Sequence, residues 1–231
     1  MLVAIHQLHY LPWLRYFEKI ARADVFVVLD DIQYNKNGWQ NRNKVKGSTG
    51  EVLLTVPVHA AFQARLDEVT VDNRHNWRKK HWRTIEQCYA KAPFFEPYAP
   101  ALKAFYTQEW GRLNELNRRM LTFFLDALGI RTPVRYSSEL AVPGEATERL
   151  VNLVRAVGGD AYYSGAYALD VYLDAAMMKA AGIRLELQHW RAPVYPQRHG
   201  EFLPDLSIAD LLMNCGPESR ATLLGAAHDS P

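Results

Sequence analysis

The chain has 231 residues, 48% hydrophobic and 23% charged, which is the composition of a folded globular protein and excludes a disordered chain. Its 27 basic and 25 acidic residues leave a net charge of +2, which argues against a nucleic-acid partner because such proteins carry a basic stripe. Two cysteines exclude a disulfide framework. The sequence shows neither a signal peptide nor the roughly 20 apolar residues of a membrane span, so we expect a cytoplasmic protein.

The first 29 residues predict a β-α-β unit. Residues 2–5 form a short apolar run that ends at His6, and apolar residues recur at helical spacing from Pro12 to Asp24. Residues 25–29 (VFVVL) form an unbroken apolar run, typical of a parallel strand covered on both faces. The polar stretch that follows, residues 33–50, predicts a long connection.

The middle of the chain predicts short strands followed by helices. The expected strands cover residues 52–58 and 69–71, and a first helix begins near Asn76 and ends before Pro93. We read Pro97 and Pro100 as breaks before a second helix, whose apolar stripe runs from Leu113 to Ala127.

An α/β alternation then resumes. The expected strands are 132–136, 161–163 and 183–190, and the expected helices are 147–157, 170–181 and one that opens with a capping box at 207–210. The last dozen residues predict a frayed tail. We therefore expect a single α/β domain over residues 1–231, with an open, mostly parallel sheet and a mostly helical insertion at about 75–130.

The loop after the first strand is the strongest candidate site. It holds His6 and His9 at H-x-x-H spacing, beside the expected start of a helix, where backbone N–H groups favour an anion. Two imidazoles there could bind phosphate oxygens and stabilise charge in phosphoryl or nucleotidyl transfer. The alternative is that one histidine packs and the other caps the turn.

Asp30 and Asp31 end the second strand, at a sheet edge where ligands bind in open α/β folds. One carboxylate could orient a histidine or hold Mg²⁺, and a magnesium or zinc site with His6 and His9 is a further reading. A pair of solvated loop acids explains the same residues.

Residues 33–43 carry the densest group of amides and bases, which suits recognition of carboxylates, phosphates and hydroxyls. Tyr163, Ser164 and Gln197 lie at other strand ends or in loops, where they either close over a ligand or pack. The basic side chains Arg78, Lys79, Lys80 and Arg83 are typical of a solvated helix face. Cys88 reads as core, and Cys215 leaves a Cys-His hydrolase open as an alternative.

Ten segments resemble the WbqC-like protein family, in order and over nearly the whole chain. They are residues 6–14 (HQLHYLPWL) with 16–17 (YF), 27–34 (VVLDDIQY), 39–43 (WQNRN), 55–58 (TVPV), Trp77 with His81, Tyr89 with 92–95 (APFF), 128–130 (LGI), 163–165 (YSG), 195–197 (YPQ) with Phe202, and 206–216 (LSIADLLMNCG). Leu8 and Arg15 depart from the family pattern, which has proline and glycine there.

That resemblance implies a biosynthetic context but does not identify the reaction. The family is often encoded among genes for O-antigen and other surface polysaccharides, and it has been suggested to attach glycine or a similar acyl group to a sugar. The first 35 residues also resemble pantothenate synthetase and the nucleotidylyltransferases, whose Rossmann-like fold places two histidines on ATP phosphates. The second resemblance implies ATP with Mg²⁺ as cofactor.

We therefore expect an acyl or aminoacyl transferase, or an ATP-dependent amide ligase, acting on an amine of a sugar or small metabolite. The expected catalytic residues are His6, His9, Asp30 and Asp31. The expected substrate-binding residues are Gln7, Tyr10, Gln33, Lys36, Trp39, Asn41, Arg42, Tyr163, Ser164 and Gln197. The alternatives are a noncatalytic module that binds a nucleotide-linked sugar or assembles a complex, and a Cys- or metal-dependent hydrolase.

Overall fold

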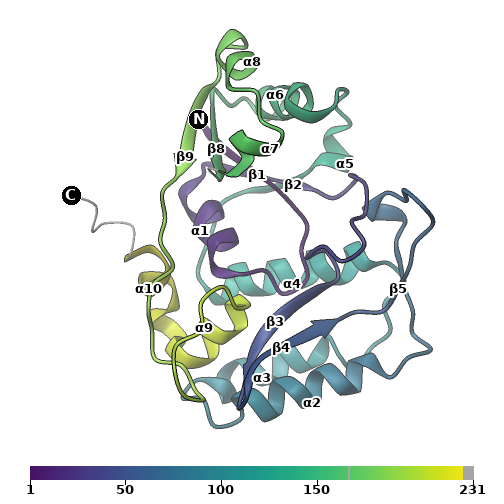
Figure 1. Ribbon diagram of the computed structural model, residues 1–231, viewed down its shortest axis with the longest axis vertical. Helices are drawn as coiled ribbons and strands as arrows, with labels where there is room; N and C mark the ends of the chain where they lie inside the picture. Colours follow the sequence, from purple (N-terminus) through teal and green to yellow (C-terminus); the bar gives the residue numbers. More distant parts are fainter. Residues whose placement is uncertain (166, 226–231) are drawn as a thin grey trace.

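A five-stranded parallel sheet forms the centre of the computed structural model, which describes residues 1–165 and 167–225 (Figure 1). The strands lie in the order β7-β2-β1-β8-β9. Their bounds are β1 Leu2–Gln7, β2 Val25–Leu29, β7 Val134–Tyr136, β8 Ala161–Gly165 and β9 Arg184–Gln188. Helices flank the sheet, so the predicted α/β class with an open parallel sheet of Rossmann-like type is confirmed.

The strand order places a switch point between β1 and β8. The chain moves from β1 to β2 through α1 (Leu14–Arg22), and it later returns from β7 past β1 to β8 through α6 (Ala146–Ala156). In open α/β sheets, ligands bind beyond the carboxyl ends of the strands at such a reversal. Here that position is marked by the end of β1 at Gln7 and the end of β8 at Gly165.

Each face of the sheet has its own core. On one face, Val3, Val27 and Tyr162 pack under α6 and the short helices α7 (Tyr167–Val171) and α8 (Ala175–Ala180). On the other face, Ala4, Phe26 and Val28 pack with α1, α4 and α9. Because both faces are covered, the continuous apolar run of β2 is stabilised as the sequence predicts.

A second region, residues 42–127, packs on the face of the parallel sheet that carries α1 (Figure 1). It contains three long helices, the antiparallel hairpin β3–β4 and the short ribbon β5–β6. Their bounds are β3 Arg42–Gly47, β4 Gly50–Thr55, β5 Val58–His59, β6 Thr70–Val71, α2 Trp77–Tyr89, α3 Phe95–Ala104 and α4 Leu113–Ala127. The remaining elements are η1 Leu66–Glu68, α5 Ser137–Leu140, α9 Ile208–Cys215, η2 Gly216–Glu218 and α10 Ser219–Gly225.

Four details of the predicted elements are wrong. The stretch 33–50 is not one connection, because its second half is β3, where buried Asn43 donates to the Leu11 carbonyl at 2.8 Å. The expected strand 52–58 divides into β4 and β5. Pro97 and Pro100 precede the predicted helix α4, but they lie inside a further helix, α3, that was not predicted, because an interior proline removes a backbone donor.

The expected helix 170–181 is two helices, because the Asp174 carboxylate accepts from Met177 N at 3.0 Å and starts α8 there. The expected frayed tail is helical through Gly225, and residues 226–231 lie outside the described residues. Half of the predicted capping box of α9 is present, since Ser207 Oγ accepts from Ala209 N at 3.2 Å, whereas the Asp210 carboxylate accepts from Tyr89, Tyr195 and Gln197. None of the described helices is long and apolar enough to cross a membrane.

Candidate functional site

The His6–His9 loop lies at the carboxyl end of β1, where α1 begins. The ring centroids of His6 and His9 are 4.8 Å apart at an angle of 83°. Tyr16 of α1 lies 5.0 Å from the His6 ring and 5.6 Å from the His9 ring, and Trp13 lies 5.2 Å from His9. The structure therefore brings both predicted histidines into one aromatic cluster at the switch point of the sheet.

Lys19 adds a buried cation to this cluster. It lies one turn after Tyr16 on α1, and only 6% of its surface is exposed. Burial lowers the Lys19 pKa from 10.5 to about 8, an effect that Glu18 opposes and Arg15 reinforces. At pH 7 the site thus holds a desolvated charge, which an anion would neutralise.

Both histidines are neutral at pH 7. Burial, followed by the charge of Lys19, lowers the His6 pKa well below 6.5 and brings the His9 pKa to about 3. A neutral imidazole offers one N–H donor and one acceptor. The pair can therefore bind an oxyanion without adding further buried charge.

Two buried polar atoms of the cluster lack partners among the described residues. These are His9 Nδ1 and the Tyr16 hydroxyl, in side chains that are 3% and 1% exposed. Leaving a buried donor or acceptor unpaired costs roughly 1–3 kcal/mol. Such groups in a native fold are typical of a site that a ligand or ordered water completes.

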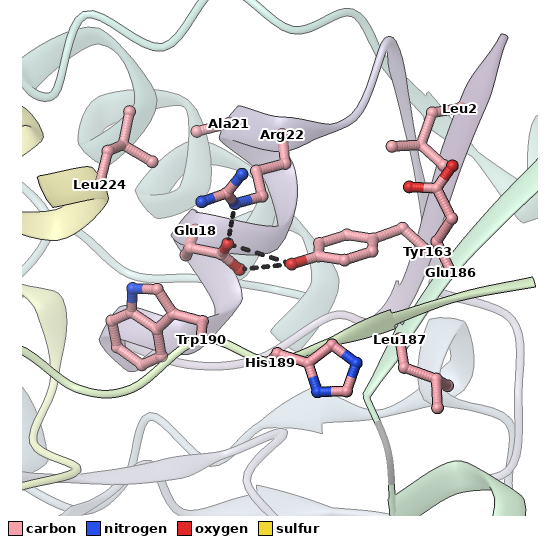
Figure 2. Close-up of a pocket in the computed structure, with 10 residues that line it drawn as sticks. All are labelled: Leu2, Glu18, Ala21, Arg22, Tyr163, Glu186, Leu187, His189, Trp190 and Leu224. Carbon is pink, nitrogen blue, oxygen red and sulfur yellow. Dashed lines mark hydrogen bonds and ion pairs between the residues drawn. The ribbon is translucent and has the colours of Figure 1, made fainter. Parts of the chain in front are cut away.

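The carboxylate of Glu18, the residue before Lys19, already accepts hydrogen bonds from within the protein. This carboxylate accepts from Arg22 Nε, from Gln188 Nε2 and, at 3.1 Å, from the Tyr163 hydroxyl. Figure 2 shows Glu18, Arg22 and Tyr163 beside a cavity of about 520 Å³ that is lined by residues of α1, β8 and β9 and by His189 and Trp190 after β9. Tyr163, a predicted substrate-binding residue, thus borders a cavity but has its hydroxyl in an internal bond.

The remaining predicted residues of the first loop have different surroundings. Gln7 Oε1 accepts from Gln40 Nε2 at 3.3 Å, next to the site. Tyr10 is fully buried, and its hydroxyl lies 2.9 Å from His81 Nδ1 and 2.8 Å from the Tyr106 hydroxyl, so it belongs to the core. Trp39 lies against Trp13, with ring centroids 5.2 Å apart, and extends the aromatic cluster.

The polar segment 33–43 supplies a second cavity. Lys36, Asn41 and Arg42 line a volume of about 330 Å³, together with Tyr34 and residues 55–58 and 60. Gln33 is exposed and pairs with Arg65 in an isolated bridge instead of lining this cavity. The structure thus brings three of the predicted substrate-binding residues together, separately from the histidine cluster.

Asp30 and Asp31 lie in a buried ion-pair network. Asp30 accepts from Arg118 and from Ser138 N at 3.0 Å, and Asp31 accepts from Arg149 and from Ser137 Oγ. The carboxylates are 1% and 9% exposed. Because arginines and serines occupy these oxygens, the arrangement suits a structural clamp between β2 and α4–α6 better than an acid or base open to substrate.

Ser164 and Gln197 are also engaged internally. Ser164 is buried at the end of β8, where its hydroxyl lies 3.3 Å from the Gly165 carbonyl. Gln197 Nε2 donates to the Asp210 carboxylate at 2.9 Å, and Gln197 Oε1 accepts from Lys46 Nζ at 3.1 Å. The network around Asp210 also takes the Tyr195 hydroxyl at 2.8 Å, so Gln197 stabilises the packing of α9.

The hydrolase reading finds no support in the described part of the chain. No group of three or more His, Cys, Asp or Glu side chains there could hold a metal ion. Burial raises the pKa of the Cys88 thiol to about 11 and raises that of Cys215, with the Asp210 charge adding to both. Neither thiol is therefore activated as a nucleophile.

The sequence reading missed Lys19 and Tyr16. Both lie in the predicted helix, three residues apart and therefore on one face. Their position in the helix directly after the H-x-x-H loop could have indicated them, because a β-α unit folds the helix back beside the end of the strand. A lysine on a short helix is ordinarily solvated, so composition gave no reason to select it.

Comparisons with known proteins show the family to which the chain belongs. The sequence pattern of the WbqC-like protein family matches residues 7–222. The chain is 38% identical over 223 residues to a Mycobacterium tuberculosis protein named "Uncharacterized protein Rv1507c", covering 94% of this chain and 95% of that protein. No solved structure matches. The match over nearly the whole chain shows that this protein belongs to the WbqC-like protein family.

Proposed function

We propose that this protein is an enzyme that transfers or ligates an acyl or aminoacyl group, for example glycyl, to an amine of a sugar or small metabolite. Its phosphate-bearing substrate, ATP or a nucleotide-linked sugar, binds at the switch point. The observation that carries the proposal is the buried cluster of His6, His9 and Tyr16 at the carboxyl end of β1, in which His9 Nδ1 and the Tyr16 hydroxyl lack partners among the described residues.

The chemistry of this cluster supports a phosphate rather than a neutral ligand. Lys19 supplies a charge held at an energetic cost in the free protein, and the Tyr16 hydroxyl and His9 Nδ1 supply unpaired hydrogen-bonding groups. A phosphate would neutralise the charge and satisfy these groups at once. The same contacts would stabilise negative charge that develops on a leaving phosphate, because they are fixed and shielded from water.

ATP with Mg²⁺ fits the cluster in part. His6, His9 and Lys19 would hold phosphate oxygens, and bound ATP would supply activation of a carboxylate. Asp30 and Asp31 offer no free ligand for Mg²⁺, because Arg118 and Arg149 occupy them. Lys19 would orient the phosphates and exclude water, while Tyr16 would donate to an oxygen beside it.

The setting in surface-polysaccharide biosynthesis rests on the family resemblance. The two free cysteines among the described residues suit the reducing cytoplasm, where we place the protein. Neither point identifies the acceptor amine.

A noncatalytic binding module is the second candidate. One observation favours it: burial lowers the pKa values of both histidines too far for either to act as an acid or base near pH 7. In that reading the same cluster binds a nucleotide-linked sugar without reacting.

Calorimetric titration tests the binding step that both candidates share. ATP, pyrophosphate and nucleotide-linked aminosugars would be titrated into wild type, Lys19→Met and His6→Ala, with Lys79→Met on the solvated face of α2 as the matched control. We expect saturable binding to wild type and Lys79→Met, and at least a tenfold loss in the other two variants. Equal affinity for all four proteins would contradict the site.

A product assay separates enzyme from module. Wild type would be incubated with ATP, glycine and a nucleotide-linked aminosugar, and mass spectrometry would follow amide formation and nucleotide consumption. Accumulation of an amide that is lost in Lys19→Met supports the enzyme. Binding of the sugar without any product over a panel of acyl donors supports the module.

A further inference from the structure

The cavity of about 330 Å³ beside β4 is lined by five residues of the segment 34–42 and by residues 55–58 and 60. Among the described residues, its charged lining side chains are Lys36 and Arg42. No acidic side chain among the described residues lines it. Two cations without an acidic neighbour favour an anionic occupant.

Arg42 is held in place for such a contact. Its terminal nitrogens donate to the Asn37 carbonyl and reach Asn37 Oδ1 at 3.5 Å, and its guanidinium lies 6.0 Å from the centre of the Trp39 ring. Its Nε is buried without a partner among the described residues. A guanidinium fixed in this way binds a carboxylate at little further entropic cost.

Asn41 adds a hydrogen-bond acceptor to the cavity wall. Its side chain is 6% exposed, and Nδ2 donates to the Val56 carbonyl at 2.8 Å, which fixes the amide. Its Oδ1 has no partner in the described part of the chain. An amide oxygen fixed in a cavity wall requires an N–H or O–H donor from the occupant or from water.

We propose that this cavity binds a small carboxylate that carries an amino or hydroxyl group on the neighbouring carbon. The carboxylate lies between Arg42 and Lys36, and the amino or hydroxyl group donates to Asn41 Oδ1. The role of this cavity as the subsite of the acyl donor rests on the proposed function, whereas the binding itself does not.

Trp39 connects the cavity to the histidine cluster. Its ring contacts Trp13, which contacts His9, while Arg42 and Lys44 lie 6.0 and 5.9 Å from its centre. Gln40 forms a second link, since it accepts from Asn35 N at 2.7 Å and donates to Gln7. Trp39 therefore lies between the cavity and the histidine cluster.

The test measures binding of glycine, glycolate and acetate by saturation-transfer NMR. Glycine and glycolate carry the additional donor and acetate does not. We expect saturable binding of at least one of the first two, with acetate about tenfold weaker. Arg42→Gln is expected to weaken binding at least tenfold because it removes the charge. Arg42→Lys is expected to weaken binding several-fold because it keeps the charge but loses the paired N–H donors of the guanidinium.

Controls separate this proposal from the function proposed above. Lys79→Gln removes an exposed charge outside the cavity, and Lys19→Met removes the charge of the histidine cluster; both are expected to keep carboxylate binding. Arg42→Gln is expected to keep binding of pyrophosphate. Absence of binding for all three carboxylates, equal binding in Arg42→Gln, or acetate bound as tightly as glycine and glycolate would overturn the inference.

Discussion

The charge of the Lys19 ammonium adds to burial in lowering the pKa of the His9 imidazole to about 3. The same lysine has its own pKa lowered to about 8 by burial. These two groups are less stable in the folded protein than in water whenever they are charged. A site that is costly in this way and incomplete in the free protein is typical of ligand binding.

Lys19→Met is expected to stabilise the protein while removing phosphate binding. The folded pKa of about 8 lies below the usual lysine value of 10.5, so below pH 8 the charged lysine destabilises the fold by roughly 3 kcal/mol. Relief of that cost corresponds to an increase of several degrees in Tm for a chain of this size. Differential scanning calorimetry at pH 7 checks it, with Lys79→Met as control. A lower Tm in Lys19→Met would contradict the account.

The stability of wild type is expected to rise between pH 8 and pH 10.5 through Lys19. In that range the unfolded chain binds the Lys19 proton and the folded chain releases it, so stability increases with pH. Urea unfolding at several pH values measures the slope. The slope should be smaller in Lys19→Met, and an identical slope in both proteins would show that the Lys19 pKa is not lowered.

Acid is expected to destabilise the protein through His9 and His81. Their folded pKa values are about 3 and about 4, in both cases lowered mainly by burial, so protonation below pH 6.5 favours the unfolded chain. Each contributes about 2 kcal/mol of lost stability on going from pH 7 to pH 5. His81→Gln should reduce the loss measured by urea unfolding, whereas replacement of the exposed His189 should leave it unchanged. Equal losses in all variants would contradict the assignment.

Asp30→Asn is expected to lower stability rather than to abolish a chemical step. It leaves Arg118 without its buried partner, and breaking such a pair costs about 3 kcal/mol. The exposed pair of Asp126 and Arg131 supplies the control, because Asp126→Asn there should change stability by about 1 kcal/mol or less. Urea unfolding and phosphate titration would be measured together. Unchanged stability with lost ligand binding would return Asp30 to the site.

The sequence predicted the elements whose stability is local. The run 25–29, the apolar stripe of α4 and the Ser207 cap each show their pattern within a few neighbouring residues of the sequence, and all three are present, although distant elements cover β2 and α4. β3 was missed because its polar residues are buried by distant partners, such as Gln197 for Lys46. Pairing over such separations leaves no periodic signal in the sequence.

The same distinction applies to the candidate site. The sequence predicted His6 and His9 as neighbours because both lie close together after a recognisable strand. It predicted Lys36, Asn41 and Arg42 as neighbours because they belong to one polar segment. The surroundings of Asp30 and Asp31 come from Arg118, Ser137 and Arg149, more than 80 residues away in the chain. Whether a carboxylate is free or paired is decided by such partners, so it could not be predicted from the sequence.

The most direct measurement is the Lys19 pKa in the free and liganded protein. Lysine labelled with ¹³C at Cε, assigned through Lys19→Met, would be titrated by NMR with and without pyrophosphate. The account predicts a pKa near 8 in the free protein and a clear upward shift when pyrophosphate binds, because the anion stabilises the charged form. A pKa near 10.5 that pyrophosphate leaves unchanged would contradict an anion site at the switch point.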